Sequence, residues 1–316
     1  MWWQSFEIGN NLGNLYLYGD GLAEDALIAQ KLYEKACTGD SNNVEEACHN
    51  LALFYDKQTY QEYSRYKAKY FYQKACDDGF AKSCFSLGYL YHKGNNVDQN
   101  ITMAIPFYKK ACDSGVIGAC NNLGVIYSKD DGIKHNKSLA ISLYKKACDG
   151  GIMEACGKVG HYYYQGNGIK QNKSMAIKFY TKACNGGFME SCSRLGYHYF
   201  HGDGIKQNKS LAINFNKKAC DSGIMESCGQ VGHHYYQGDG IEQNKSMAIN
   251  FFKQACNGGS IQACENIGII YDKGDGIDQN KSLAMNIYKK ACNGGSFESC
   301  NNLAYGYYTH LKTNTK

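Results

Sequence analysis

Sixteen cysteines form a regular series of pairs along the chain. In most pairs the members are eight residues apart, as Cys184 and Cys192 are on either side of the turn Asn185-Gly186-Gly187. From Cys76 onward each pair follows the last after 36 residues. The pairs are Cys37 and Cys48, Cys76 and Cys84, Cys112 and Cys120, Cys148 and Cys156, Cys184 and Cys192, Cys220 and Cys228, Cys256 and Cys264, and Cys292 and Cys300. Paired thiols can form disulfides, and as thiolates they bind metals or act as nucleophiles.

Three interpretations of these pairs are open from the residues. The cysteines could be disulfides in an oxidising compartment, reduced and buried small side chains, or zinc ligands. We favour disulfides, because alanine would fill a small buried site equally well and chance would not pair every cysteine. Zinc needs four ligands, and no regular histidine or further cysteine accompanies each pair. We therefore expect no metal and no other cofactor, and we expect the cysteines to be poor nucleophiles.

The sequence contains only one of the motifs that serine β-lactamases use. Such enzymes use Ser-x-x-Lys together with a second polar motif and Lys-Thr-Gly. The chain has two Ser-x-x-Lys matches, at Ser64–Lys67 and Ser142–Lys145, and no Lys-Thr-Gly. Both matches fall inside expected helices of a lysine-rich chain, where chance explains them. No nucleophile elbow, zinc-protease motif or phosphate-binding loop is present, so no catalytic residue can be assigned.

Histidines recur in consecutive units near the end of one predicted helix, at His161, His198, His201, His233 and His234. Equivalent positions in stacked helices lie about 10 Å apart, whereas metal ligands must lie ~2 Å from a shared ion. A metal site is therefore not expected. Two interpretations remain open, which are solvent-facing polar residues and a binding groove.

Of these two interpretations, the binding groove makes the more specific prediction. Its residues lie on the face opposite the repeating core positions, and they vary where the core positions repeat. Aromatic and histidine side chains with polar neighbours suit peptide or glycan recognition, and repeat proteins bind through extended surfaces. The candidate binding residues are Lys158, His161, Tyr162, Arg194, Tyr197, His198, Gln230, His233 and His234.

The elements that would position these residues are helical hairpins. In one unit Ala155, Cys156, Val159, Gly160 and Tyr163 recur at three- and four-residue spacing, which places them on one helix face. The glycine in this helix recurs in the other units, and it fits close approach of a neighbouring backbone. The tyrosine is expected to be a core aromatic residue.

A glycine loop and a second helix complete each unit. Gly166 and Gly168 supply helix termination, and the second helix begins near Asn172 with Ala176 and Tyr180 facing inward. Asparagine is a favoured N-cap, but Asn-Lys-Ser is also a glycosylation sequon, and we favour capping. The sequons lie at Asn100, Asn136, Asn172, Asn208, Asn244 and Asn280.

We expect one solenoid domain over residues 1–316, because stacked units share a continuous core. A turn longer by three residues separates Cys37 from Cys48, and the next unit is irregular. The expected units are 5–41, 44–79, 81–115, 117–151, 153–187, 189–223, 225–259 and 261–295, followed by a capping helix at 297–311.

The motif ACxxLGxxYxxGxGIxxNxxxAxxxYxKAC covers nearly the whole chain. At 119–148 it reads ACNNLGVIYSKDDGIKHNKSLAISLYKKAC, with Asp130 in place of the first glycine of the loop. It resembles the Sel1-like repeat, a relative of the tetratricopeptide repeat. The cysteine pairs resemble those of the Helicobacter cysteine-rich proteins, which are secreted. The resemblance implies an all-α, right-handed α/α solenoid or superhelix of helix hairpins, with one disulfide per hairpin and a concave face. It also implies an adaptor function, or penicillin binding with weak β-lactamase activity.

Composition narrows the range of partners. The net charge is +5, and Arg65 and Arg194 are the only arginines. Lysine serves less well than arginine in base or phosphate recognition, and no basic cluster occurs, so we expect no nucleic-acid partner. No apolar run approaches the ~18 residues of a membrane span. The first residues do not resemble a secretory signal, so either the chain is cytosolic or its signal lies outside this sequence.

These observations favour a secreted or periplasmic repeat scaffold that binds protein or peptide partners through its concave face. Cell-wall-derived and host extracellular molecules are candidate partners, and we expect a monomer. One alternative is a β-lactam-binding protein with weak hydrolase activity, which rests on resemblance alone. A third interpretation is a cytosolic adaptor with reduced cysteines.

Overall fold

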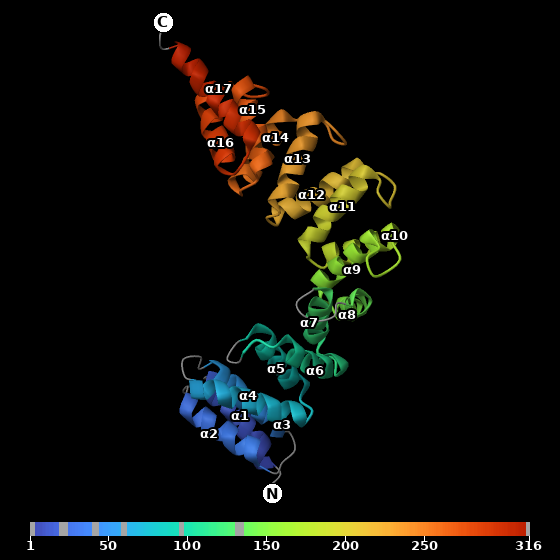
Figure 1. The fold of residues 1–316 in the computed structure, drawn as a ribbon, viewed down its shortest axis with the longest axis vertical. Coiled ribbons are helices and arrows are strands. Elements are labelled where there is room, and N and C mark those ends of the chain that lie inside the picture. The colour runs from blue at the N-terminus through green and yellow to red at the C-terminus, as the bar shows by residue number, and fades with distance from the viewer. Residues whose placement is uncertain are drawn as a thin grey trace. The chain divides into compact units, whose positions relative to one another are not determined.

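The computed structural model describes residues 4–18, 25–39, 44–57, 62–94, 98–129 and 136–313. These residues form helices and no strands (Figure 1). The helices are α1 (Gln4–Tyr18), α2 (Ala26–Thr38), α3 (Val44–Lys57), α4 (Glu62–Asp77), α5 (Ala81–Lys93), α6 (Ile101–Asp113), α7 (Ile117–Ser128), α8 (Lys137–Asp149), α9 (Met153–Gln165), α10 (Lys173–Asn185), α11 (Met189–His201), α12 (Lys209–Asp221), α13 (Met225–Gln237), α14 (Lys245–Asn257), α15 (Ile261–Lys273), α16 (Lys281–Asn293) and α17 (Phe297–Thr313).

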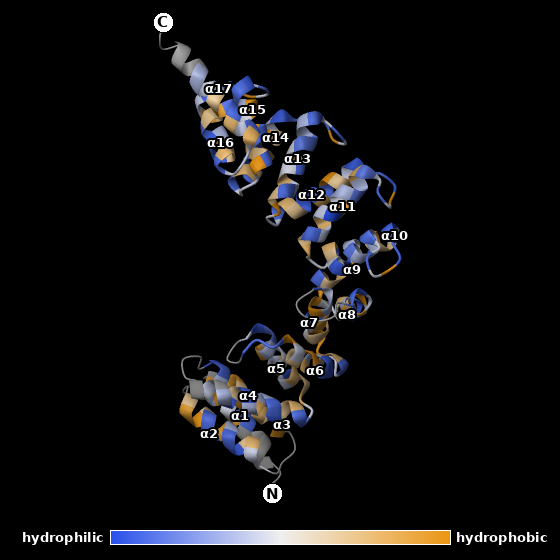
Figure 2. Ribbon diagram, viewed as in Figure 1, coloured by the Kyte–Doolittle hydropathy of each residue, from blue (hydrophilic) through white to orange (hydrophobic). Residues whose placement is uncertain are grey.

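The chain divides into two compact units, Met1–Ile152 and Met153–Lys316. Within each unit a helix packs against the helices before and after it in the sequence, which is the arrangement of a solenoid. The helices are amphipathic rather than uniformly apolar, as Figure 2 shows. The expected all-α solenoid of hairpins is confirmed, whereas one continuous domain over residues 1–316 stays a prediction.

Each hairpin pairs a first helix, which we call the A helix, with a second, the B helix. The helical glycine of the A helix packs against an aromatic ring of the B helix. A Cβ atom added at Gly160 would lie 2.8 Å from Cδ1 of Tyr180, and 3.2 Å from the backbone oxygen of Ala176. The expectation of a neighbouring backbone is therefore corrected, because a fully buried ring makes the closest approach. The same glycine and ring pairs are Gly13 and Tyr33, Gly88 and Tyr108, Gly124 and Tyr144, Gly232 and Phe252, and Gly268 and Tyr288.

Gly160→Ala should lower the free energy of unfolding by about 1–3 kcal/mol, because the added methyl group would overpack against the Tyr180 ring. Alanine is intrinsically the better helix former by up to ~1 kcal/mol, so the loss measures steric conflict. Gly229→Ala is the matched control, since nothing lies within 4 Å of a Cβ added there. Urea unfolding measures both variants, and equal effects would contradict the packing argument.

Disulfides join consecutive hairpins at the turn between them. Cys184 at the end of α10 and Cys192 at the start of α11 have Cα atoms 4.8 Å apart. Cys148 and Cys156 are also disulfide-bonded, and none of the cysteines, all of which the structure describes, is free. These bonds indicate an oxidising compartment. The other bonds are Cys37–Cys48, Cys76–Cys84, Cys112–Cys120, Cys220–Cys228, Cys256–Cys264 and Cys292–Cys300.

A lysine reinforces the same joint. Lys218 Nζ donates a hydrogen bond to the carbonyl oxygen of Cys184, 3.2 Å away and one repeat earlier in the chain. The negative end of the preceding B helix dipole also stabilises a cation at this position. The same contact is made by Lys74 to Cys37, Lys110 to Cys76, Lys146 to Cys112 and Lys290 to Cys256.

Asparagine caps begin the B helices. Oδ1 of Asn172 accepts the backbone N–H of Met175 at 2.9 Å, so the side chain satisfies a donor at the helix start. Equivalent bonds occur at Asn100, Asn136, Asn208, Asn244 and Asn280. The capping interpretation of the recurring sequon thus matches the structure.

Candidate functional site

Three hollows follow one another along the A helices α11, α13 and α15 of the second unit. The first has a volume of about 470 Å³, and its lining includes Arg194 and His198. The second, which we call the Asn216 hollow, measures about 350 Å³. The third measures about 500 Å³ and includes Gln230 and His233.

Neighbouring hollows share residues in their walls. Ser193 and Tyr197 line the first two, Gln230 lines the last two, and Glu226 lines all three. We therefore treat the three as one groove, the A-helix groove, defined by the residues that line them. Each repeat contributes an equivalent helix to the groove, but the side chains on these helices differ. Such an arrangement suits selective binding.

The structure brings together most of the residues that the sequence predicted for a groove. Arg194, Tyr197, His198, Gln230, His233 and His234 line the A-helix groove. Lys158, His161 and Tyr162 of α9 are half-buried and line none of its three hollows. Lys158 instead pairs with Glu154 at 2.7 Å on its own helix.

Two of the predicted histidines are buried rather than solvent-facing. His198 and His234 are each 3% exposed. They occupy the helix position that Leu90, Ile126 and Ile270 fill in other repeats, where the side chain is also buried. The repeat alignment therefore contained the signal for burial, and the interpretation of these two histidines as solvent-facing residues was wrong.

The surroundings of the two histidines differ. The ring of His198 lies 4.9 Å from that of Tyr164, and its Nδ1 lies 3.1 Å from the backbone oxygen of Asp203. The ring of His234 lies 4.6 Å from that of Phe200, and its Nδ1 has no hydrogen-bond partner within the described structure. Burial lowers the pKa of both histidines, so both are neutral at pH 7.

Several groove residues were missed by the sequence reasoning, among them Glu190, Phe200, Asn216 and Glu226. Asn216 had a visible signal, because the equivalent positions carry the aromatic rings that pack on the helical glycines. Glu190 and Glu226 occupy equivalent exposed positions, and neither forms an ion pair with any described residue. The groove thus combines exposed carboxylates with aromatic and amide groups.

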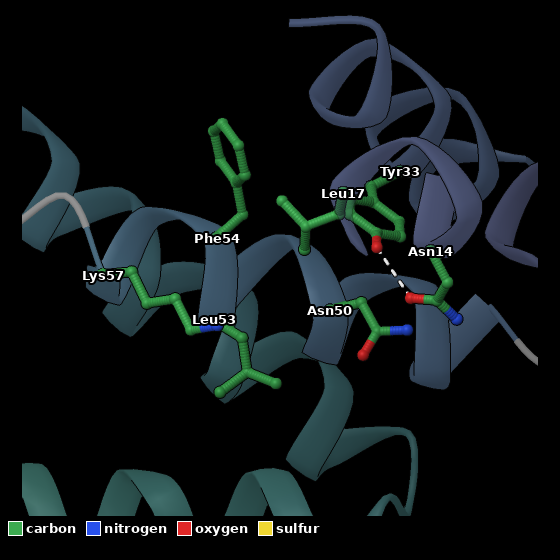
Figure 3. Close-up of a pocket in the computed structure, with 7 residues that line it drawn as sticks. All are labelled: Asn14, Leu17, Tyr33, Asn50, Leu53, Phe54 and Lys57. Carbon is green, nitrogen blue, oxygen red and sulfur yellow. Dashed lines mark hydrogen bonds between the residues drawn. The ribbon is translucent and has the colours of Figure 1, made fainter. Parts of the chain in front are cut away.

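A smaller hollow of about 130 Å³ lies in the first unit, among α1, α2 and α3. Tyr33 donates a hydrogen bond from its hydroxyl to Oδ1 of Asn14 at 2.7 Å, as Figure 3 shows. Asn50 in its wall also donates to Asn10 at 2.8 Å. Because these polar groups are already paired within the chain, this hollow is a weaker candidate than the A-helix groove.

Within the described ranges, no group of three or more His, Cys, Asp or Glu residues is placed to hold a metal ion. No helix in this part of the chain combines the length and apolar character that crossing a membrane requires.

The stacked hairpins, the disulfides between them and the groove define a class, the α-helical repeat scaffold. The Sel1 repeat family model matches eight segments that together cover most of the chain, so the chain belongs to the Sel1 repeat family. The matched residues are 10–41, 45–80, 81–116, 117–152, 154–188, 190–224, 226–260 and 261–296. A search of curated proteins found no significant match.

Solved structures share the fold. A protective antigen of uropathogenic Escherichia coli matches with a TM-score of 0.86 and 22% identity over 96% of this chain, which spans only 65% of that antigen's chain. A Sel1 repeat protein of Oxalobacter formigenes matches with a TM-score of 0.77 and 20% identity, over 95% of this chain and 86% of the other. Cysteine rich protein B of Helicobacter pylori is 30% identical over 42% of this chain and 97% of its own, with a TM-score of 0.34. At these identities the first two likenesses show the fold alone.

Proposed function

We propose that this chain is a secreted or periplasmic scaffold, a monomer, that binds a protein or peptide partner through the A-helix groove. The observation that carries the proposal is the continuity of the three hollows, whose walls share Tyr197, Glu226 and Gln230. The disulfides support the compartment, because such bonds persist outside the reducing cytosol. Cell-wall-derived peptides and host extracellular proteins are partners that such a location would offer.

The dimensions of the groove suit an extended segment. Neighbouring packed helices lie about 8–10 Å apart, and an extended chain advances about 3.3 Å per residue. Successive A helices are separated by a B helix in the packing order, so each repeat would meet at least about three residues of a bound peptide. A short segment crossing α11, α13 and α15 would place side chains in all three hollows.

Tyr197 supplies the contact surface expected of an affinity-determining residue. Its side chain is 53% exposed and lines two of the three hollows. Tyrosine is enriched among such residues because it offers a large rigid surface with a polar end. The exposed carboxylates of Glu190 and Glu226 add a preference for partners that carry positive charge.

A peptide library selected on the oxidised chain tests the proposal. Tyr197→Ala should weaken the selected peptides at least about tenfold, because it removes an exposed aromatic surface from the groove. Tyr89→Ala is the matched control, since Tyr89 is exposed at the same helix position of α5 in the first unit. Equal affinities for both variants, or failure to enrich any peptide, would contradict the proposal. No observation in the described structure favours the β-lactamase alternative, and we do not propose it.

A further inference from the structure

The Asn216 hollow exists where an aromatic ring is missing from the repeat. In six other hairpins a tyrosine or phenylalanine of the B helix packs on the helical glycine of the A helix, as Phe252 does on Gly232. In the hairpin of α11 and α12 the glycine is retained as Gly196, but Asn216 replaces the ring. Both residues line the hollow, so the smaller side chain opens the space that a ring fills elsewhere.

Two buried polar side chains border this hollow without hydrogen-bond partners. Asn216 is 4% exposed, and none of the described residues hydrogen-bonds to its side-chain amide. His234 is 3% exposed, and its Nδ1 has no partner among the described residues. Leaving a buried polar atom unpaired costs about 1–3 kcal/mol, so Nδ1 of His234 points to a ligand that pairs it. The Asn216 amide, which has no partner among the described residues, lies at the same hollow and can pair with that ligand.

The remaining wall favours a flat cation. The rings of Tyr197 and Phe200 line the hollow, as does Glu226, whose carboxylate forms no ion pair with any described residue. No lysine or arginine is among the residues that line the hollow. Lys209 lies 5.3 Å from the centre of the Phe200 ring, but its charge is paired with Asp239 at 2.6 Å. His201, which also lines the hollow, is exposed to solvent.

We propose that the Asn216 hollow is the anchor subsite of the A-helix groove and takes an arginine side chain of the bound peptide. This inference rests on the proposed function. A guanidinium offers five N–H donors in one plane and stacks on aromatic rings. Its donors pair Oδ1 of Asn216, Nδ1 of neutral His234 and the Glu226 carboxylate. Lysine supplies a point charge without the planar fork, and an apolar side chain leaves Nδ1 of His234 unpaired.

The test uses groove peptides that differ at one position, which carries arginine, citrulline, lysine or leucine. Binding to the oxidised full chain is measured by fluorescence anisotropy. The arginine peptide should bind at least about tenfold more tightly than the leucine and citrulline peptides, since a charge-assisted hydrogen bond is worth a factor of this size. Citrulline matters because it has nearly the shape of arginine without the charge.

Three substitutions test which side chains of the chain produce the preference for the arginine peptide. Asn216→Tyr places the residue of most other repeats at this position and should make the affinities for the arginine and leucine peptides about equal. Glu226→Gln should lower the ratio of these two affinities by at least about tenfold. Glu298→Gln, at the equivalent exposed position of α17, should leave it unchanged. Far-ultraviolet circular dichroism confirms that each variant is folded.

The possible failures are distinguishable. Peptides that lose affinity with Tyr197→Ala yet bind equally with arginine or leucine would overturn the arginine subsite and leave the peptide groove standing. Arginine preference that survives Asn216→Tyr would place the cation elsewhere and would also overturn the inference. If no peptide binding depends on Tyr197, the proposed function fails, and the subsite fails with it.

Discussion

Replacing Cys220 and Cys228 together with alanine should lower the free energy of unfolding by about 2–3 kcal/mol, the value of a short disulfide-closed loop in the chain-entropy model. This bond joins α12 to α13, its two cysteines are eight residues apart, and both are fully buried. Alanine is preferred to serine in the test, since a buried hydroxyl would add its own desolvation cost. Urea unfolding of the oxidised double variant and the oxidised native chain measures the difference.

Reduction of the native chain supplies the control. It breaks every disulfide, so its unfolding midpoint should fall below that of the double variant. The sum of the single-bond values is an upper bound on the loss, because residual structure in the unfolded chain reduces each gain. If the double variant and the native chain unfold at the same urea concentration, the bonds contribute little stability. Rapid alkylation of all sixteen thiols in natively isolated protein would then favour the cytosolic adaptor.

The joint between repeats explains why the loss should concentrate there. A solenoid helix packs mainly on its sequence neighbours, so few distant contacts compensate for a weakened turn. At the preceding joint along the chain the disulfide Cys184–Cys192 and the hydrogen bond from Lys218 hold the same helix end. Removal of one bond should therefore increase local opening of α12 and α13 before the chain unfolds globally.

The sequence predicted those features that repeat. One unit was expected at 153–187, and the structure has α9 at Met153–Gln165 and α10 at Lys173–Asn185 in that range. The cysteine spacing indicated the turns between helices, because a fixed period places each pair at the same point of each hairpin. Local signals such as the Asn172 cap were also readable, since the cap bonds to a residue only three positions away.

Contacts between repeats were harder to predict, because they join residues far apart in the sequence. The hydrogen bond from Lys218 to the Cys184 carbonyl spans 34 residues. The local motif Lys-Ala-Cys does not predict which carbonyl accepts that bond. The burial of His198 could have been read from the apolar residues at equivalent positions. Asn216 could likewise have been recognised by aligning the repeats, because most of the others carry an aromatic ring at that position.

Phe252→Asn should lower the free energy of unfolding of the second unit by about 3–5 kcal/mol, the range for deleting a buried aromatic ring. Phe252 is 1% exposed and packs on Gly232, so its loss opens the same kind of space that Asn216 leaves in the preceding hairpin. The new amide would also be buried, which adds a polar cost unless water reaches it. Thermal unfolding, followed by circular dichroism at several urea concentrations, measures the loss.

The reverse substitution, Asn216→Phe, is the matched control and should stabilise the unit by about 0.5–2 kcal/mol, the usual gain from filling a cavity. Opposite signs in the two variants would show that the native chain keeps Asn216 at a cost in stability. Such a cost is typical of binding sites, where local packing is given up for ligand contacts. If Asn216→Phe destabilises the chain as much as Phe252→Asn does, Asn216 fits its surroundings as well as a ring fits elsewhere. The hollow would then be a packing feature, and the physical basis for an arginine subsite would be lost.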